Sequence, residues 1–78
     1  MKIYCYGDSR NLIGDKIKAL RKARGLTQEG LAKNLQLKGY EFSDLMILRI
    51  ENGTRFVPDF EVKIFAEEFG VSYQYLLD

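Results

Sequence analysis

Four glycines divide most of this sequence into short segments, and this spacing constrains the fold more than any other feature. Gly25, Gly39, Gly53 and Gly70 each come after a stretch that carries apolar residues at helical spacing. Glycine is the usual residue just after the last turn of a helix, because it adopts the left-handed conformation without a steric penalty. The spacing therefore predicts short helices joined by short loops.

Residues that favour helix starts precede each of these segments. Asn11, Thr27, Ser43 and Ser72 are candidate N-caps, and Pro58-Asp59 opens another helix. We expect five helices: one between Asn11 and Gly25, one from Thr27 to near Gln36, one over roughly 44–51, one from Pro58-Asp59 to Gly70, and a short one after Ser72. The residues expected to form the core are Ile13, Ile17, Leu20, Leu31, Ala32, Leu35, Ile47, Ile50, Val62, Phe65, Ala66, Phe69, Tyr75, Leu76 and Leu77. The fold class that follows is all-α.

The first residues do not fit the helical pattern. Residues 3–6, Ile-Tyr-Cys-Tyr, have the composition of a strand and end at a turn signal over residues 7–9. Such a segment needs a partner, and Phe60 and Ile64 offer one beside the core stripe of the fourth helix, within one chain or across a dimer. We therefore expect an N-terminal extended arm over residues 1–10 and one domain over residues 11–78.

The composition removes several classes of function. The chain has 78 residues, no histidine and one cysteine, Cys5. This excludes disulfides within one chain, Cys/His zinc sites and Ser-His or Cys-His catalysis. No apolar run approaches the roughly 20 residues that span a bilayer, and no signal peptide opens the chain. We expect a cytoplasmic protein that is not an enzyme, with no cofactor, no metal, no membrane contact and no small-molecule ligand.

The net charge of +1 conceals an uneven distribution. Residues 1–38 carry nine Lys or Arg against three acids, a net of +6, and residues 39–78 have a net of −5. This split indicates a basic face for an anionic partner. The alternative is that the acidic half neutralises the basic half in the folded chain.

Three motifs in order resemble the helix-turn-helix domain of the phage repressor and Cro (XRE) family. They are Leu26-Thr27-Gln28 after Gly25, then Ile50-Glu51-Asn52-Gly53, then Phe69-Gly70-Val71-Ser72 with Leu76-Leu77. The resemblance covers about residues 12–78. It implies a five-helix, lambda-repressor-like domain whose third helix enters the major groove of double-stranded DNA. It also implies a bacterial or phage transcription regulator of the repressor type that acts as a homodimer.

Residues around the third helix carry the expected DNA contacts. Gln28 is the first residue of the second helix, where its side chain and the free backbone N–H groups can donate to a phosphate, although it can also be an ordinary exposed residue. Asn52-Gly53 matches the family's second phosphate clamp and is equally a helix cap. The connection over residues 37–42 is longer than the family's usual tight turn. The candidate DNA-contacting residues are Thr27, Gln28, Lys33, Lys38, Ser43, Asp44, Leu45, Leu48, Arg49, Asn52, Thr54 and Arg55; Lys33 and Lys38 are equally well explained as solvated lysines.

The third helix itself allows two interpretations. Arg49 suits bidentate contact with guanine, and Leu45 suits contact with a thymine methyl group. The carboxylate of Asp44 can accept a hydrogen bond from a cytosine amino group, but its charge repels phosphate. Because Leu45, Met46 and Leu48 make this helix apolar nearly all round, the alternative is a protein-interaction module on the same fold, with weak or lost DNA binding.

The resemblance also implies one structural ion pair. Arg21 in the first helix and Glu51 at the end of the third match residues that pair across the family's core. Their role would be to hold the third helix in place rather than to contact DNA.

Overall fold

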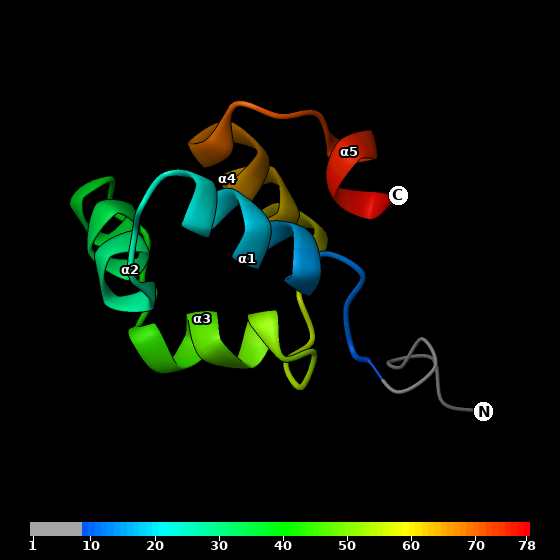
Figure 1. Cartoon of the computed structure of the whole chain (residues 1–78), viewed down its shortest axis with the longest axis horizontal. Coiled ribbons are helices and arrows are strands. Elements are labelled where there is room, and N and C mark those ends of the chain that lie inside the picture. The colour runs from blue at the N-terminus through cyan, green and yellow to red at the C-terminus, as the bar shows by residue number, and fades with distance from the viewer. Residues whose placement is uncertain (1–8) are drawn as a thin grey trace.

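The computed structural model describes residues 9–78, which form five helices (Figure 1). The helices are α1 (Gly14–Ala23), α2 (Gln28–Leu37), α3 (Asp44–Glu51), α4 (Asp59–Phe69) and α5 (Tyr73–Leu77). Apart from an isolated bridge residue at Ser9, these helices are the regular structure of the described part. The predicted five-helix all-α fold is confirmed. The expected strand-like segment at residues 3–6 lies outside the described residues.

The helices begin at side-chain caps and end at glycines largely where the sequence predicts. The hydroxyl oxygens of Thr27, Ser43 and Ser72 each accept a hydrogen bond from a backbone N–H in the first turn of α2, α3 and α5. All four predicted stop glycines have a positive φ, which L-residues with a Cβ atom rarely adopt. Local sequence therefore sets the ends of these helices.

The start of α1 departs from the prediction. The N-cap position is Ile13 rather than Asn11, and α1 begins at Gly14. The side chain of Asn11 nevertheless accepts hydrogen bonds from the backbone N–H groups of Ile13, at 3.1 Å, and Gly14, at 2.8 Å. The predicted N-cap position is wrong by two residues, although Asn11 still satisfies N–H groups at this end.

The core contains most of the predicted apolar residues and one unexpected aromatic ring. The buried set is Ile13, Ile17, Leu31, Ala32, Leu35, Phe42, Ile47, Ile50, Val62, Phe65, Ala66, Phe69 and Leu76. Phe42, from the connection between α2 and α3, packs edge-on against Phe65 with the ring centroids 5.3 Å apart. Leu20 is only partly buried. Tyr75 and Leu77 are exposed, so the prediction that they close the core is wrong; only Leu76 of α5 does so.

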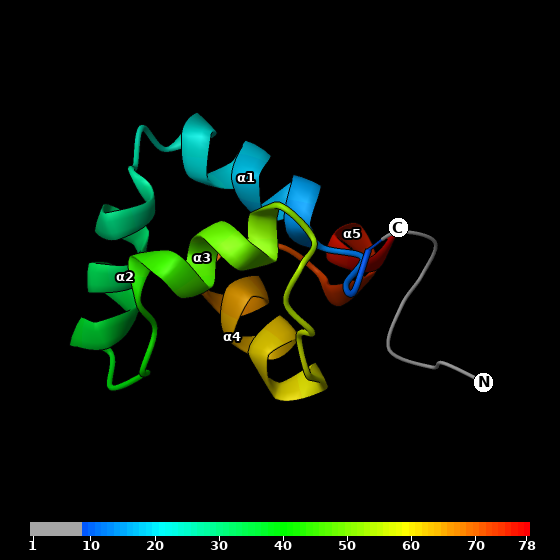
Figure 2. The ribbon, with the colours of Figure 1, turned by 90° about the horizontal axis from the view of Figure 1, so that it is seen from below.

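The packing of the helices places α3 at one border of the molecule. It packs against α1 and α2, and α4 packs against α5. In Figure 1, α3 runs along the lower edge with α1 above it, and Figure 2 shows it from below with its outer side uncovered by other helices. One long side of α3 is therefore available to a partner.

None of the five helices in residues 9–78 is long and apolar enough to cross a membrane. No group of three His, Cys, Asp or Glu side chains between residues 9 and 78 gathers closely enough to hold a metal ion.

Candidate nucleic-acid interface

The outer side of α3 has a mixed chemical character. Its exposed residues are Asp44, Leu45, Leu48 and Arg49, whereas Ile47 and Ile50 are fully buried. This division follows from helical geometry, because residues three and four apart share a face. The structure thus brings together on one surface the three residues that the resemblance assigns to base contact, Asp44, Leu45 and Arg49, with Leu48 beside them.

Arg49 is the cation of this surface. Its guanidinium makes no hydrogen bond or ion pair to any of residues 9–78. Its carbonyl oxygen, in contrast, accepts from the backbone N–H groups of Thr54, at 2.9 Å, and Arg55, at 3.2 Å. The end of α3 is therefore fixed through its backbone while the guanidinium is available to a partner.

Arg21 and Glu51, which the resemblance pairs, form a two-point ion pair in the interior. Arg21 Nε lies 2.7 Å from Glu51 Oε2, and Nη2 lies 3.0 Å from Oε1. A third donor, Arg21 Nη1, binds the carbonyl oxygen of Leu26 at 2.8 Å. The hydrogen bond to Glu51 raises the pKa of Arg21 above its ordinary value, against the opposing effect of burial. The pair joins α1 to the last residue of α3.

Gln28 is turned toward this ion pair rather than away from the protein. Its Nε2 donates to Glu51 Oε1 at 3.1 Å, and its side chain is partly buried. It occupies the first position of α2, where backbone N–H groups have no partner within the helix. The backbone at this position is therefore free to bind an anion even while the side chain is held by Glu51.

The loop after α3 is ordered by its own polar side chains. Asn52 Oδ1 accepts from both the backbone N–H of Thr54, at 3.1 Å, and its hydroxyl, at 2.6 Å. Both residues are exposed. Since the oxygen of the Asn52 amide is used within the loop, its nitrogen is the atom left to donate outward.

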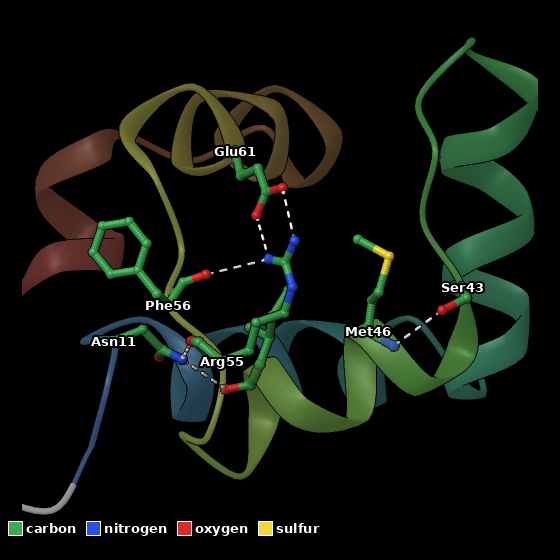
Figure 3. Close-up of polar contacts among 7 residues, drawn as sticks. Asn11, Ser43, Met46, Arg55, Phe56 and Glu61 are labelled. Carbon is green, nitrogen blue, oxygen red and sulfur yellow. Dashed lines mark hydrogen bonds and ion pairs between the residues drawn. The ribbon is translucent and has the colours of Figure 1, made fainter. Parts of the chain in front are cut away.

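Arg55 has a different arrangement from the one that the resemblance implies. Its guanidinium binds both oxygens of Glu61, at 2.5 and 3.1 Å, and Nη1 also donates to the carbonyl oxygen of Phe56 at 3.3 Å (Figure 3). Glu61 lies in the first turn of α4 and is buried. A phosphate would therefore have to replace Glu61 at the two Nη atoms or share the guanidinium with it. Sequence reasoning missed Glu61; the available signal was an acid in the first turn of a helix shortly after an arginine.

Several basic residues of the first half of the chain bind the acidic half. Lys38 Nζ pairs with Glu68 at 2.5 Å. Arg24 donates to the carbonyl oxygens of Glu68 and Phe69 at the end of α4, and Lys16 donates to that of Tyr75. A cation at a helix C-terminus is favourable because the carbonyl oxygens there carry partial negative charge. Neutralisation within the fold thus accounts for part of the charge asymmetry.

Lys33, unlike Lys38 and Arg55, is a candidate phosphate contact whose charge is not paired within residues 9–78. It is exposed on α2, and it forms no ion pair or hydrogen bond through its side chain with residues 9–78. Arg49 on α3 and Lys33 on α2 are thus two exposed cations that residues 9–78 leave available to an anionic partner.

Asn11 connects the start of α1 to the loop after α3, a contact that no sequence motif predicts. Its Nδ2 donates to the carbonyl oxygens of Ile50, at 3.1 Å, and Arg55, at 2.9 Å (Figure 3). Gly14 allows the start of α1 to lie this close to the end of α3, because a Cβ atom there would overlap the carbonyl oxygen of Ile50. No periodic signal marks such a contact between segments about 40 residues apart.

Comparison with known proteins agrees with this geometry. Residues 14–78 match the model of the helix-turn-helix domain family, and the chain belongs to that family. The fold is similar to the crystal structure of the DNA-binding domain of BldD, with a TM-score of 0.74, 23% identity, and coverage of 95% of this chain and 100% of that one. It is also similar to the DNA-binding domain of BldD from S. venezulae, with a TM-score of 0.70, 25% identity, and coverage of 87% and 94%. A comparison with curated protein sequences found no match.

Proposed function

We propose that this chain is a sequence-specific, non-catalytic regulator of transcription that binds double-stranded DNA, of the Cro and repressor type. One observation carries the proposal: the exposed face of α3 presents Asp44, Leu45, Leu48 and Arg49, while the buried face of α3 is held against α1 and α2. An α-helix presented in this way fits the major groove of B-DNA. The similarity to the DNA-binding domain of BldD supports the same conclusion.

Base contacts would come from three residues of α3. Arg49, whose guanidinium is unpaired within residues 9–78, would donate to O6 and N7 of a guanine. Leu45 would contact a thymine methyl group. Asp44 would accept from a cytosine amino group, and its Oδ1 already accepts from the N–H of Leu45 at 2.9 Å, so its position at the start of the helix is fixed.

Backbone contacts would flank α3 on both sides. The start of α2, at Thr27 and Gln28, offers N–H groups to one phosphate. The loop with Asn52 and Thr54 would hold another. Lys33 is free to add a charge contact, and Ser43 lies at the start of α3. Lys38 and Arg55 would contribute less, because each cation is already shared with Glu68 or Glu61.

A single module of this size covers one half-site, so we propose that it acts as a homodimer on a symmetric operator, with half-sites about 34 Å apart. Such a regulator works where the chromosome lies, in the cytoplasm of a bacterium. Residues 11–78 would form the DNA-binding domain and residues 1–10 the arm.

The proposal is tested by selecting bound sites from a random pool of duplex DNA and measuring affinity for the selected and for unselected duplexes at two salt concentrations. A regulator yields a consensus site, and its affinity falls steeply with salt because phosphate contacts release counterions. Recovery of no consensus, together with no salt-dependent binding, would show that DNA is not the partner.

The second candidate function is a protein-interaction module on the same fold. It is favoured by the exposure of Leu45, at 47%, and Leu48, at 42%, on the same face as Arg49. An apolar pair at the centre of a surface is typical of protein interfaces. Binding to random duplex DNA at low salt separates the two, because this candidate predicts essentially none.

A further inference from the structure

An apolar groove lies between the start of α4 and α5, away from the proposed DNA-contacting face. It encloses about 650 Å³ and is lined by Val57, Asp59, Phe60, Val62, Lys63, Tyr73 and Leu77. Phe60 is 62% exposed, Tyr73 51% and Leu77 46%. Large apolar side chains gathered around one concave surface are typical of a site that another segment covers. None of the proposed DNA contacts uses this groove.

The first described residues, Ser9 and Arg10, lie against the loop that leads to this groove. The backbone N–H of Arg10 donates to the carbonyl oxygen of Gly53 at 2.8 Å. A Cβ atom on Gly53 would come within 2.7 Å of Ser9 Oγ, which shows how closely Ser9 lies against it. In Figures 1 and 2 the segment before α1 lies at the same end of the molecule as α5.

The remaining distance is short enough for the preceding residues to cross. Val57 lines the groove and follows Gly53 by four residues, so the two lie at most about 14 Å apart. An extended stretch over residues 3–8 spans up to about 20 Å. An extended chain that runs back from Ser9 is therefore long enough to bring the start of this segment to the rim of the groove at Val57 in the same chain.

The chemistry of residues 3–6 matches that of the groove. Ile3, Tyr4, Cys5 and Tyr6 are four consecutive apolar or aromatic residues, and they would otherwise present this surface to water. In an extended conformation alternate side chains point to one side, so Ile3 and Cys5 would enter the groove together. The charges of the two partners are also complementary, because Lys2 and Asp8 flank the apolar run while Asp59 and Lys63 line the groove.

We propose that residues 3–6 cover the groove between α4 and α5 of the same chain. The segment then closes the apolar surface that α5 leaves open, because only Leu76 of that helix is buried by the other helices. This inference does not depend on DNA binding, and it identifies the occupant as part of this chain rather than a second copy.

The single cysteine makes the proposal directly testable in the full chain. Lys63→Cys and Tyr73→Cys each place a second thiol in the groove, and oxidation with diamide converts two neighbouring thiols to a disulfide. Asp15→Cys is the matched control, because Asp15 is exposed and follows Ser9 by only six residues, so an undocked arm reaches it as readily. We expect an intrachain disulfide with Cys5 to form roughly tenfold faster at one of the groove positions than at the control, since docking raises the effective concentration of the thiol.

Reactivity of Cys5 in the otherwise unchanged protein gives an independent measurement. Docking should protect its thiol from a soluble disulfide reagent, and Phe60→Ser should raise the rate by roughly tenfold, which corresponds to about 1.4 kcal/mol of docking free energy. Leu37→Ser is the control, because Leu37 is 78% exposed and lies at the end of α2, outside the groove.

Three results would overturn the proposal. Equal disulfide rates at the groove and control positions would show that the arm does not dock there. Disulfide-linked dimers at micromolar protein, without the intrachain product, would place the arm in the groove of a second copy. A thiol that reacts at the same rate in the wild type and in Phe60→Ser would show that Phe60 does not cover it.

Discussion

The side-chain nitrogen of Asn11 lies 2.9 Å from the carbonyl oxygen of Arg55, a residue 44 positions further along the chain. The same amide group also donates to Ile50 and accepts from two N–H groups at the start of α1. All four hydrogen-bonding positions of this one side chain are therefore used. It links the first helix to the end of α3 and to the loop proposed to hold DNA.

Asn11→Asp separates the two roles of this amide group. The carboxylate keeps acceptors for the N–H groups of Ile13 and Gly14 but places negative charge against two carbonyl oxygens in place of two donated hydrogen bonds. We expect a loss of about 1–3 kcal/mol in the free energy of unfolding, measured by urea denaturation. Gln74→Glu makes the same chemical change at an exposed position of α5 and should cost little. Equal losses of unfolding free energy in the two variants would show that the hydrogen bonds donated by Asn11 do not stabilise the fold.

Removing one partner of the buried ion pair should be far more costly than removing both. Arg21→Met leaves the carboxylate of Glu51 buried without its cation, which typically costs about 3–5 kcal/mol. The double variant Arg21→Met with Glu51→Leu leaves no unpaired charge and should recover much of that loss. Thermal unfolding of the three proteins measures the difference. If the double variant is as unstable as the single one, the ion pair stabilises the fold beyond the mutual neutralisation of its two charges.

The pH dependence of this pair follows from the raised pKa of Arg21. A folded-state pKa above the unfolded one adds stability at pH values below the unfolded pKa, and this stability is lost as the pH rises through the folded value. For arginine both values lie in strongly alkaline solution. The ion pair itself should therefore give no change in melting temperature between neutral and moderately alkaline pH.

Arg55 should contribute little to the salt dependence of DNA binding while Glu61 holds it. Arg55→Gln is expected to leave the slope of log affinity against log salt unchanged, whereas Glu61→Gln frees the guanidinium and should make the slope steeper by up to about 0.9. Lys33→Gln serves as the comparison, because its cation is already free and its loss should reduce the slope by about 0.9. A lower slope in Arg55→Gln would mean that DNA displaces Glu61.

Gly14 is needed for space rather than for backbone conformation. Gly14→Ala would drive a methyl group into the carbonyl oxygen of Ile50, and we expect a loss of about 1–3 kcal/mol of stability. Gly30→Ala is the control within a neighbouring helix; its methyl group would lie 3.2 Å from Thr27 Oγ1, and the change should stay within about 1 kcal/mol. Comparable melting temperatures for the two variants would contradict the close packing of α1 on α3.

Local signals in the sequence predicted most of the fold. The bounds of α3 and α4 follow from a serine cap, a proline and two glycines, because each acts through the backbone of its own neighbours. The face that α3 exposes follows from the spacing of Ile47 and Ile50. These features depend on residues within a few positions of each other, so the sequence order is enough to find them.

Contacts between distant segments could not be predicted in the same way. The burial of Phe42 depends on how the connection over residues 38–43 folds back over the core, where it meets Phe65. The pairing of Arg55 with Glu61 depends on the angle at which α4 leaves the loop. α5 is so short that the packing of the other helices, rather than its own pattern, decides that Leu76 is buried and Leu77 is not.

The most direct test of the central claim is the affinity of Arg49→Ala for a selected operator and for a random duplex of equal length, at one fixed salt concentration. If α3 reads bases, the wild type prefers the operator, and the variant loses about 1–3 kcal/mol on the operator with little change on random DNA. Lys33→Gln, which removes a free cation outside α3, should instead weaken both duplexes alike. A variant at Arg49 that keeps the full preference of the wild type, or a wild type that shows no preference, would contradict base recognition by α3.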